Sequence, residues 1–160
     1  MSDLREHLAE SGFKDVRTLL QSGNIVLQSE SAKRGEVERR IEAVVASAFG
    51  RPTECFARTA VEWRAIIARN PFPREAAEDP ARTTALLLKE TPPTRAWRAL
   101  QAAISGPEIV RGASDHGYIV FPEGQGRSRL TPDRIERALG TRATIRNWNT
   151  VTKIGDLLSP

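Results

Sequence analysis

The order of strand and helix signals in the second half of the chain restricts the fold more than any other feature of the sequence. Residues 83–88 are rich in β-branched residues at their start and continuously apolar at their centre, which is typical of a strand buried on both faces. The pattern then predicts a helix over 93–105, a hairpin over 108–121, a helix over 131–139 and a short strand over 144–146. This order of strand, helix, strand, strand, helix and strand is that of a ferredoxin-like fold.

The same order predicts how the strands are arranged. Segments 83–88 and 118–121 are the most continuously apolar, so we expect them in the middle of a four-stranded antiparallel sheet. We also expect the strands at 118–121 and 144–146 to run antiparallel to each other, with their carboxyl ends at opposite edges of the sheet. A last helix, capped by Asn149, should follow the final strand.

The first half of the chain has the same order with one strand fewer. A helix is expected from Ser2 to Gly12, a hairpin with strands at 16–21 and 25–28, a helix over 33–49 and a strand over 53–58. We therefore predict an α+β protein with tandem ferredoxin-like halves at 1–58 and 83–160, the first lacking its first strand. Because that strand is central in this fold, the incomplete half should form a homodimer, borrow a strand, or pair 53–58 directly with the hairpin.

Residues 59–82 are predicted to link the two halves. Thr59 and Glu62 have the spacing of a capping box, in which a hydroxyl and a carboxylate accept each other's backbone N–H groups at a helix start. The stretch 74–82 that follows this helix is polar and bounded by prolines, so we expect a loop.

Composition excludes several classes of protein. Leu, Ile, Val and Phe make up 37 of the 160 residues, enough for a folded core, and apolar runs such as Ala85–Leu88 are far shorter than the roughly 20 residues that span a bilayer. We expect a cytoplasmic protein with no membrane segment. Cys55 is the only cysteine and is accompanied by only His7 and His116, so we expect no disulfide, no Cys/His metal site and no cofactor.

Positive charge is concentrated near the carboxyl end of the sequence. The net charge is +4, yet residues 124–153 carry seven basic residues against Asp133 and Glu136 alone. This excess predicts an anionic partner, a phosphate-bearing small molecule or a nucleic acid. The basic residues are Arg127, Arg129, Arg134, Arg137, Arg142, Arg146 and Lys153.

Two motifs in this basic segment are candidate ligand sites. Gly124–Ser128 lies between a strand and a helix, where glycines permit a nest of N–H groups for an anion, with Arg127 as charge and Ser128 as hydroxyl donor. A flexible connection is the alternative. The second motif offers a cation, two amides and a hydroxyl before a helix, and its alternative is helix capping with a buried Trp148. Its candidate residues are Arg146, Asn147, Asn149, Thr150 and Lys153.

A third polar motif lies in the first hairpin. Gln21, Ser22 and Asn24 surround Gly23, and a tight turn is the simpler interpretation because Gly and Asn tolerate positive φ. We keep the three polar residues as candidate ligand contacts. His116 is interpreted as a turn residue and Cys55 as a strand thiol without a catalytic partner.

Four motifs in this order resemble a bacterial family, domain of unknown function 1697. The resemblance runs from about Met1 to Leu158 and implies a tandem ferredoxin-like fold and no established activity. The family's usual first strand and Arg-Gly-Ile-Asn-Val-Gly-Gly loop have no counterpart here. The motifs are Gln21-Ser22-Gly23-Asn24, Asn70-Pro71-Phe72, Gly126-Arg127-Ser128-Arg129-Leu130 and Arg146-Asn147-Trp148-Asn149-Thr150-Val151.

Three classes of function are compatible with these features. The interpretation we favour is a binding module for a phosphate-bearing ligand or nucleic acid, with Arg127, Ser128, Arg146, Asn147 and Asn149 converging on one surface. The second is an enzyme of unknown reaction that uses the same Arg, Ser and Asn groups, for which no catalytic base can be assigned. The third is a protein-interaction module that uses an exposed sheet.

Overall fold

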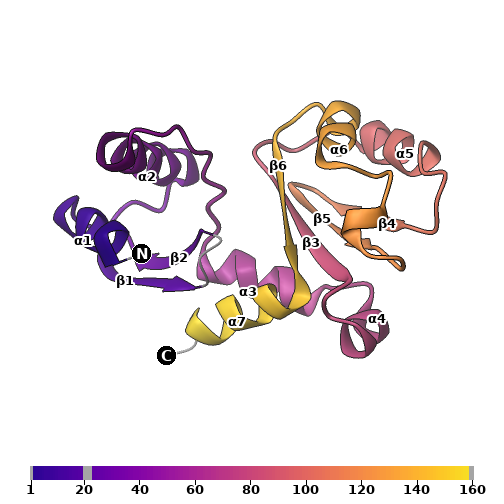
Figure 1. Cartoon of the computed structure of the whole chain (residues 1–160), viewed down its shortest axis with the longest axis horizontal. Coiled ribbons are helices and arrows are strands. Elements are labelled where there is room, and N and C mark those ends of the chain that lie inside the picture. Colours follow the sequence, from indigo (N-terminus) through magenta and orange to yellow (C-terminus); the bar gives the residue numbers. More distant parts are fainter. Residues whose placement is uncertain (1, 20–22, 159–160) are drawn as a thin grey trace. The chain divides into compact units, whose positions relative to one another are not determined.

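The computed structural model describes residues 2–19 and 23–158, which form two compact units (Figure 1). The first unit is Met1–Trp63 with Ile154–Pro160, and the second is Arg64–Lys153. The protein has an α+β architecture with two separate antiparallel sheets. Within the described ranges, every helix is too short or too polar to cross a membrane.

The first unit is built on a two-stranded sheet. Helix α1 (Ser2–Glu10) precedes the antiparallel strands β1 (Lys14–Leu19) and β2 (Asn24–Gln28), and α2 (Arg34–Phe49) follows them. Figure 1 shows α1 and α2 beside this hairpin. Apolar residues at helical and strand spacing meet here, and α2 ends at Gly50 with φ of 64°, as the glycine stop signal predicts. One buried cluster of this unit consists of Leu8, Phe13, Val37 and Ile41.

The strand expected over 53–58 is absent, and this prediction was wrong. The segment pairs with neither β1 nor β2. Its backbone is bound by α2 instead, since Cys55 N–H donates to Glu42 Oε1 and Ala57 N–H to Glu38 Oε1, each at 2.8 Å. Glu38 and Glu42 are four residues apart on one helix face, so their carboxylates match N–H groups two residues apart in an extended chain.

The linking region contains more helix than the sequence predicted. Helix α3 (Ala60–Ala68) begins with the predicted capping box, in which Thr59 N–H donates to Glu62 Oε2 at 2.8 Å and Glu62 N–H to Thr59 Oγ1 at 3.2 Å. The loop expected over 74–82 is partly wrong, because residues Pro73–Glu78 form a short helix, α4. Pro73 occupies the first turn, where its missing N–H has no cost.

The second unit is built on a four-stranded antiparallel sheet of order β4-β5-β3-β6. The central position of β3 and β5 confirms the prediction from their apolar sequences, and all six residues of β3 are buried. Because β3 is antiparallel to both β5 and β6, these two strands run parallel, and the expectation that they would be antiparallel was wrong. The strands are β3 (Thr83–Leu88), β4 (Ile109–Ala113), β5 (His116–Val120) and β6 (Ala143–Asn147).

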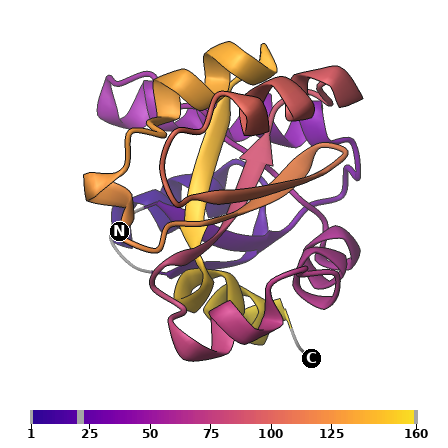
Figure 2. The same cartoon turned by 90° about the vertical axis from the view of Figure 1, so that its right-hand side faces the viewer.

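Two helices cover one face of this sheet. Helices α5 (Thr94–Ala102) and α6 (Pro132–Leu139) lie side by side (Figures 1 and 2). Helix α6 has the predicted Thr131 cap and the Gly140 stop. The core that they bury against the sheet is Leu86, Leu88, Leu100, Val110, Ile119, Phe121, Leu130, Ile135 and Leu139.

A pair of glycines makes room for the largest side chain of this layer. Gly112 of β4 lies opposite Gly117 of β5, and the Trp97 ring of α5 packs directly on both. A Cβ would lie 2.2 Å from the ring at Gly112 and 2.6 Å from it at Gly117. Glycine is therefore required at both positions for α5 to approach the sheet this closely.

Candidate functional site

The amino end of β3 brings the two predicted basic motifs together. Because β5 and β6 run parallel on either side of β3, the loops that follow them leave the sheet at the same end. Phe121 N–H donates to Arg82 O, and Trp148 N–H donates to Pro80 O, each at 2.9 Å. Two strand spacings put these chain segments about 10 Å apart. We call this region, residues 80–82, 121–130 and 146–153, the β3-start site.

Arg82 is a cation of this site that the sequence analysis missed. Its Nη1 donates to Pro122 O at 2.6 Å, its Nε lies 3.5 Å from Asp79 Oδ2, and its side chain is 49% exposed. Arg82 belongs to neither motif. The only signal in the sequence that could have assigned it to the site is its position directly before the central strand. The guanidinium both holds the loop after β5 and remains in contact with solvent.

In the loop after β5, several backbone N–H groups donate to carbonyls of the same loop. It contains a 3₁₀ turn, η1 (Gln125–Arg127), preceded by Gly124 with φ of 87°. N–H groups that an anion-binding nest would present are donated internally, from Gly124 to Phe121 O and from Ser128 to Gln125 O. Arg127 is exposed to solvent. The loop therefore presents a cation to a ligand, while these backbone donors are engaged.

Ser128 has a structural role in this loop. Its hydroxyl donates to Glu108 Oε1 at 2.5 Å and accepts the N–H of Leu130 at 3.0 Å. A hydrogen bond to a carboxylate at this length is a strong one. Glu108 lies 20 residues earlier in the chain, so sequence spacing did not predict this contact.

The second motif forms the start of α7 (Trp148–Leu158), and its cap differs from the prediction. Asn147 Oδ1 accepts the N–H of Thr150 at 3.1 Å, so Asn147 is the cap and Asn149 lies inside the helix. Trp148 and Thr150 are buried, whereas Asn149 and Lys153 are exposed. The motif thus divides into residues that build the helix and residues that remain available to a ligand.

Arg146 lies on the sheet face opposite α5 and α6. Ile145, its neighbour, packs into the core under these helices, and adjacent strand residues point to opposite faces. The Arg146 guanidinium donates to Thr144 Oγ1 at 2.8 Å and to Ile145 O at 3.0 Å, and burial lowers the pKa of Arg146. The register places it in one row across the sheet with Arg111, Tyr118 and Ala85.

The middle of this row is covered. Tyr118 is 1% exposed, and its hydroxyl donates to Ile66 O at 2.7 Å. Burial raises the pKa of Tyr118 to about 12, although the positive charge of Arg69 opposes this shift. The central strands therefore present no open aromatic surface on which a nucleic-acid base could stack.

His116 is the first residue of β5, and its assignment to the turn was wrong. The hairpin turns at Ser114 and Asp115, with Ser114 at φ of 69°. His116 Nδ1 lies 3.3 Å from Asp115 Oδ1, and Nε2 lies 3.4 Å from the Tyr118 hydroxyl. Asp115, His116 and Tyr118 form a chain of an acid, an imidazole and a phenol, which is an arrangement used for proton transfer. The phenol is buried, however, and its hydroxyl donates to a backbone carbonyl.

The candidate contacts in the first hairpin are not part of this site. Gln21 and Ser22 lie outside the described residues. Asn24 is the first residue of β2 rather than part of the turn, is 6% exposed, and donates from Nδ2 to Leu19 O at 3.3 Å. Its amide therefore helps to close the hairpin.

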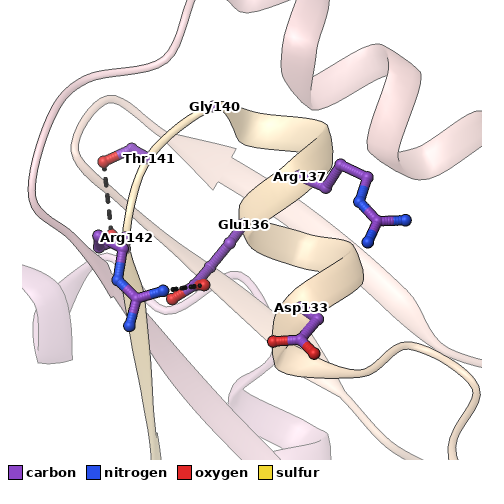
Figure 3. A pocket seen from close by; sticks show the side chains of 6 residues that line it. All are labelled: Asp133, Glu136, Arg137, Gly140, Thr141 and Arg142. Atoms are coloured by element: carbon purple, nitrogen blue, oxygen red, sulfur yellow. Dashed lines mark hydrogen bonds and ion pairs between the residues drawn. The ribbon is translucent and has the colours of Figure 1, made fainter.

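An open depression of about 430 Å³ lies at the end of α6 (Figure 3). Glu136 lines this depression, and both of its carboxylate oxygens have partners. Oε2 pairs with Arg142 Nη1 at 2.8 Å, and Oε1 accepts the N–H of Ala143 at 3.0 Å. Arg137 points away from this pair in Figure 3. The depression contains the ion pair that joins α6 to β6, and it lies at the sheet end opposite the β3-start site.

A second cavity, of about 230 Å³, lies under η1. Gln125 lines it together with core residues of β3, α6 and β6, including Leu86, Ile135 and Ile145. The part of the chain that the structure describes holds no group of three His, Cys, Asp or Glu side chains able to bind a metal.

Residues 1–118 match the family model described as "Protein of unknown function (DUF1697)". The chain belongs to this family. The DUF1697 chain also resembles a solved structure, that of the conserved bacterial protein SP0830 from Streptococcus pneumoniae, with a TM-score of 0.73 and 22% sequence identity over 99% of this chain and 88% of that one. At this identity the similarity is one of fold. No curated protein matches the DUF1697 chain.

Proposed function

We propose that this DUF1697 protein is a binding module whose second unit holds a phosphate-bearing ligand at the β3-start site. The observation that carries the proposal is the parallel direction of β5 and β6, which makes both basic motifs leave the sheet at the same end. Arg82, Arg127 and Lys153 would supply positive charge and Asn149 a neutral donor. The proposal also treats the two units as ferredoxin-like halves, the first one incomplete.

The distribution of charge between the units supports an anionic ligand. The second unit, residues 64–153, contains fifteen Lys and Arg against nine Asp and Glu, whereas the first contains nine against eleven. The net charge of the chain therefore comes entirely from the unit with the four-stranded sheet. A positive field of this kind attracts phosphate groups before any specific contact forms.

Phosphate groups occur both in small metabolites and along nucleic acids, and salt dependence separates the two sources. Binding of a nucleic acid releases counterions, so its association constant should fall with a slope of roughly −0.7 to −0.9 per phosphate contact in a plot of log K against log salt. A small ligand should raise the melting temperature in a saturable way and with a weaker salt dependence.

The test uses the whole chain and two variants. Short single- and double-stranded RNA and DNA are titrated at low and near-physiological salt, and nucleotides and phosphosugars are screened by thermal shift. Arg127→Ala should weaken binding without changing the fold, because its side chain is exposed. Arg95→Ala is the matched control, since Arg95 is an exposed arginine at the start of α5, beyond the opposite end of β3.

Equal loss of binding in both variants would show that net charge alone is responsible and would overturn the site. No binding in either series would reject the proposal and favour a protein-interaction module. The enzyme alternative has no observation in its favour. The series Asp115, His116 and Tyr118 combines an acid, an imidazole and a phenol, but the phenol of Tyr118 is buried.

A further inference from the structure

Among the described residues, strand β2 has one edge that pairs with a strand and one edge that pairs with none. In the described residues β1 is the only strand that pairs with β2, whereas β5 in the second unit pairs with β4 on one side and β3 on the other. The extended segment around Cys55 and Ala57 forms no strand pair with β2, and two of its N–H groups bind α2. Alternate residues along Ile25–Gln28 therefore direct backbone N–H and C=O groups away from β1.

The two outer edges of this hairpin differ in their protection. β1 carries Lys14, Asp15 and Arg17, and its register is broken between Lys14 and Arg17, where Asp15 has φ of 49°. Charged residues and bulges are the features that prevent an edge strand from pairing with another chain. β2 reads Asn-Ile-Val-Leu-Gln and contains neither a charge nor a bulge. Of the two strands, only β1 carries these features.

We propose that the edge of β2 that faces away from β1 pairs, along Ile25–Leu27, with β2 of a second copy of this chain, giving a continuous antiparallel sheet of order β1-β2-β2-β1. An antiparallel pair around a two-fold axis must be self-complementary. β2 meets this condition with Val26 at the axis, because Val26 then lies opposite its own copy and Ile25 lies opposite Leu27. Cross-strand aliphatic pairs of this kind stabilise a sheet.

Two residues of β2 would gain burial in this arrangement. Ile25 and Leu27 pack against the core of the first unit but are only half-buried, so the copy would cover the part that is exposed, whereas Val26 at the axis is already only 8% exposed. Repulsion between copies is also smallest here, because the first unit is nearly neutral and the second carries the positive excess. A second copy is therefore a better occupant than a basic or acidic peptide.

The oligomeric state of the whole chain tests the proposal. Sedimentation equilibrium from about 1 µM to about 1 mM should show the mass rising towards that of a dimer, because an edge of five residues gives only weak association. Leu27→Lys should weaken association at least about tenfold by putting a cation opposite Ile25. A monomer over the whole range would overturn the proposal.

Cross-linking tests the register without introducing a charge. In a Cys55→Ser background, Val26→Cys should form a covalent dimer on oxidation, because directly opposed residues in an antiparallel pair are within disulfide range. Arg17→Cys is the matched control, since Arg17 is the partner of Val26 on the protected strand. Equal cross-linking of both variants, or none of Val26→Cys in a sample that dimerises, would reject pairing through β2.

Discussion

The two units differ in the size of their antiparallel sheets, which have, among the described residues, two strands in the first unit and four in the second. In the second unit β3 lies between β5 and β6, and all six of its residues are buried. In the first unit β2 pairs with β1 alone among the described strands, and Ile25 and Leu27 of β2 are half-buried. Two core clusters reflect this difference: the cluster under α5 and α6 has nine buried residues, and the cluster around Leu8 and Ile41 has four.

The comparison teaches that a central strand does more than add hydrogen bonds. It buries both of its faces and so connects the layers on either side of the sheet into one core. Among the described residues of the first unit no strand lies between two others, and carboxylates supply some of the backbone contacts: Glu38 and Glu42 accept N–H groups of the extended segment around Cys55 and Ala57. We expect the first unit to be the less stable of the two.

The largest effect should come from matched core truncations in the two units. Leu86 and Leu8 are both fully buried. Leu86→Ala should cost about 3–5 kcal/mol, because its neighbours are fixed in a larger core, and Leu8→Ala about 2–3 kcal/mol, because its half-buried neighbours can move into the space. Urea-dependent hydrogen exchange, followed at amides of each unit, measures the loss of unfolding free energy in the two variants. Equal losses would show that the cores are equally rigid.

The next effect concerns the only tyrosine of the chain, which reports on the second unit. Burial raises the pKa of Tyr118 to about 12, above its ordinary value near 10. The folded state thus holds this proton more tightly, so the stabilisation is complete below pH 10 and is lost as the pH rises towards 12. The loss should reach roughly 2–3 kcal/mol.

Ultraviolet absorbance of the phenolate gives this measurement directly, with a folded midpoint near pH 12 and an unfolded midpoint near pH 10. Tyr118→Phe should remove the pH dependence between these values. A folded midpoint near 10 would mean that water reaches the hydroxyl and that the second unit is looser than its burial indicates.

Overpacking the glycine pair tests the second unit from the other face of the sheet. Gly117→Ala would place a Cβ 2.6 Å from the Trp97 ring and 3.0 Å from Arg111 O, so we expect a loss of about 1–3 kcal/mol. Gly126→Ala is the control, because nothing lies within 4 Å of its Cβ position. Thermal denaturation compares them. Similar melting temperatures would mean that α5 can move away from the sheet at little cost.

The smallest effect should come from the carboxylates that bind the extended segment of the first unit. Glu38→Ala removes the acceptor of the Ala57 N–H and should cost about 1–2 kcal/mol, while Glu38→Gln retains an oxygen and should cost less. Hydrogen exchange at Ala57 gives the local measurement, with faster exchange in Glu38→Ala. Unchanged exchange would show that other contacts hold this segment.

Local sequence signals predicted most of the elements correctly. The capping box at Thr59 and Glu62, the glycine stop at Gly50 and the Thr131 cap were all predicted, because each depends on residues within about four positions of one another. The central position of β3 and β5 was predicted from their apolar sequences. The strand expected at 53–58 failed because its extended backbone was predicted from propensity, whereas pairing depends on a neighbouring strand.

The candidate site was predicted only in part. Asn147 rather than Asn149 caps α7, because the cap is set by where β6 ends, and Ser128 is engaged by a carboxylate from a distant segment. Arg82 was missed because nothing in its local sequence distinguishes it. It becomes part of the site only when the strands pair around it.

The sequence by itself determined the α+β class, the family, most helix boundaries and the concentration of positive charge near the carboxyl end. Only the tertiary structure decided that β5 and β6 run parallel on either side of β3, that both basic motifs leave the sheet at one end with Arg82, and that β2 pairs with β1 alone among the described strands. The physical reason is that caps and amphipathic faces are formed between near neighbours. Strand direction and edge pairing depend on hydrogen bonds between segments tens of residues apart, whose partners no local pattern specifies.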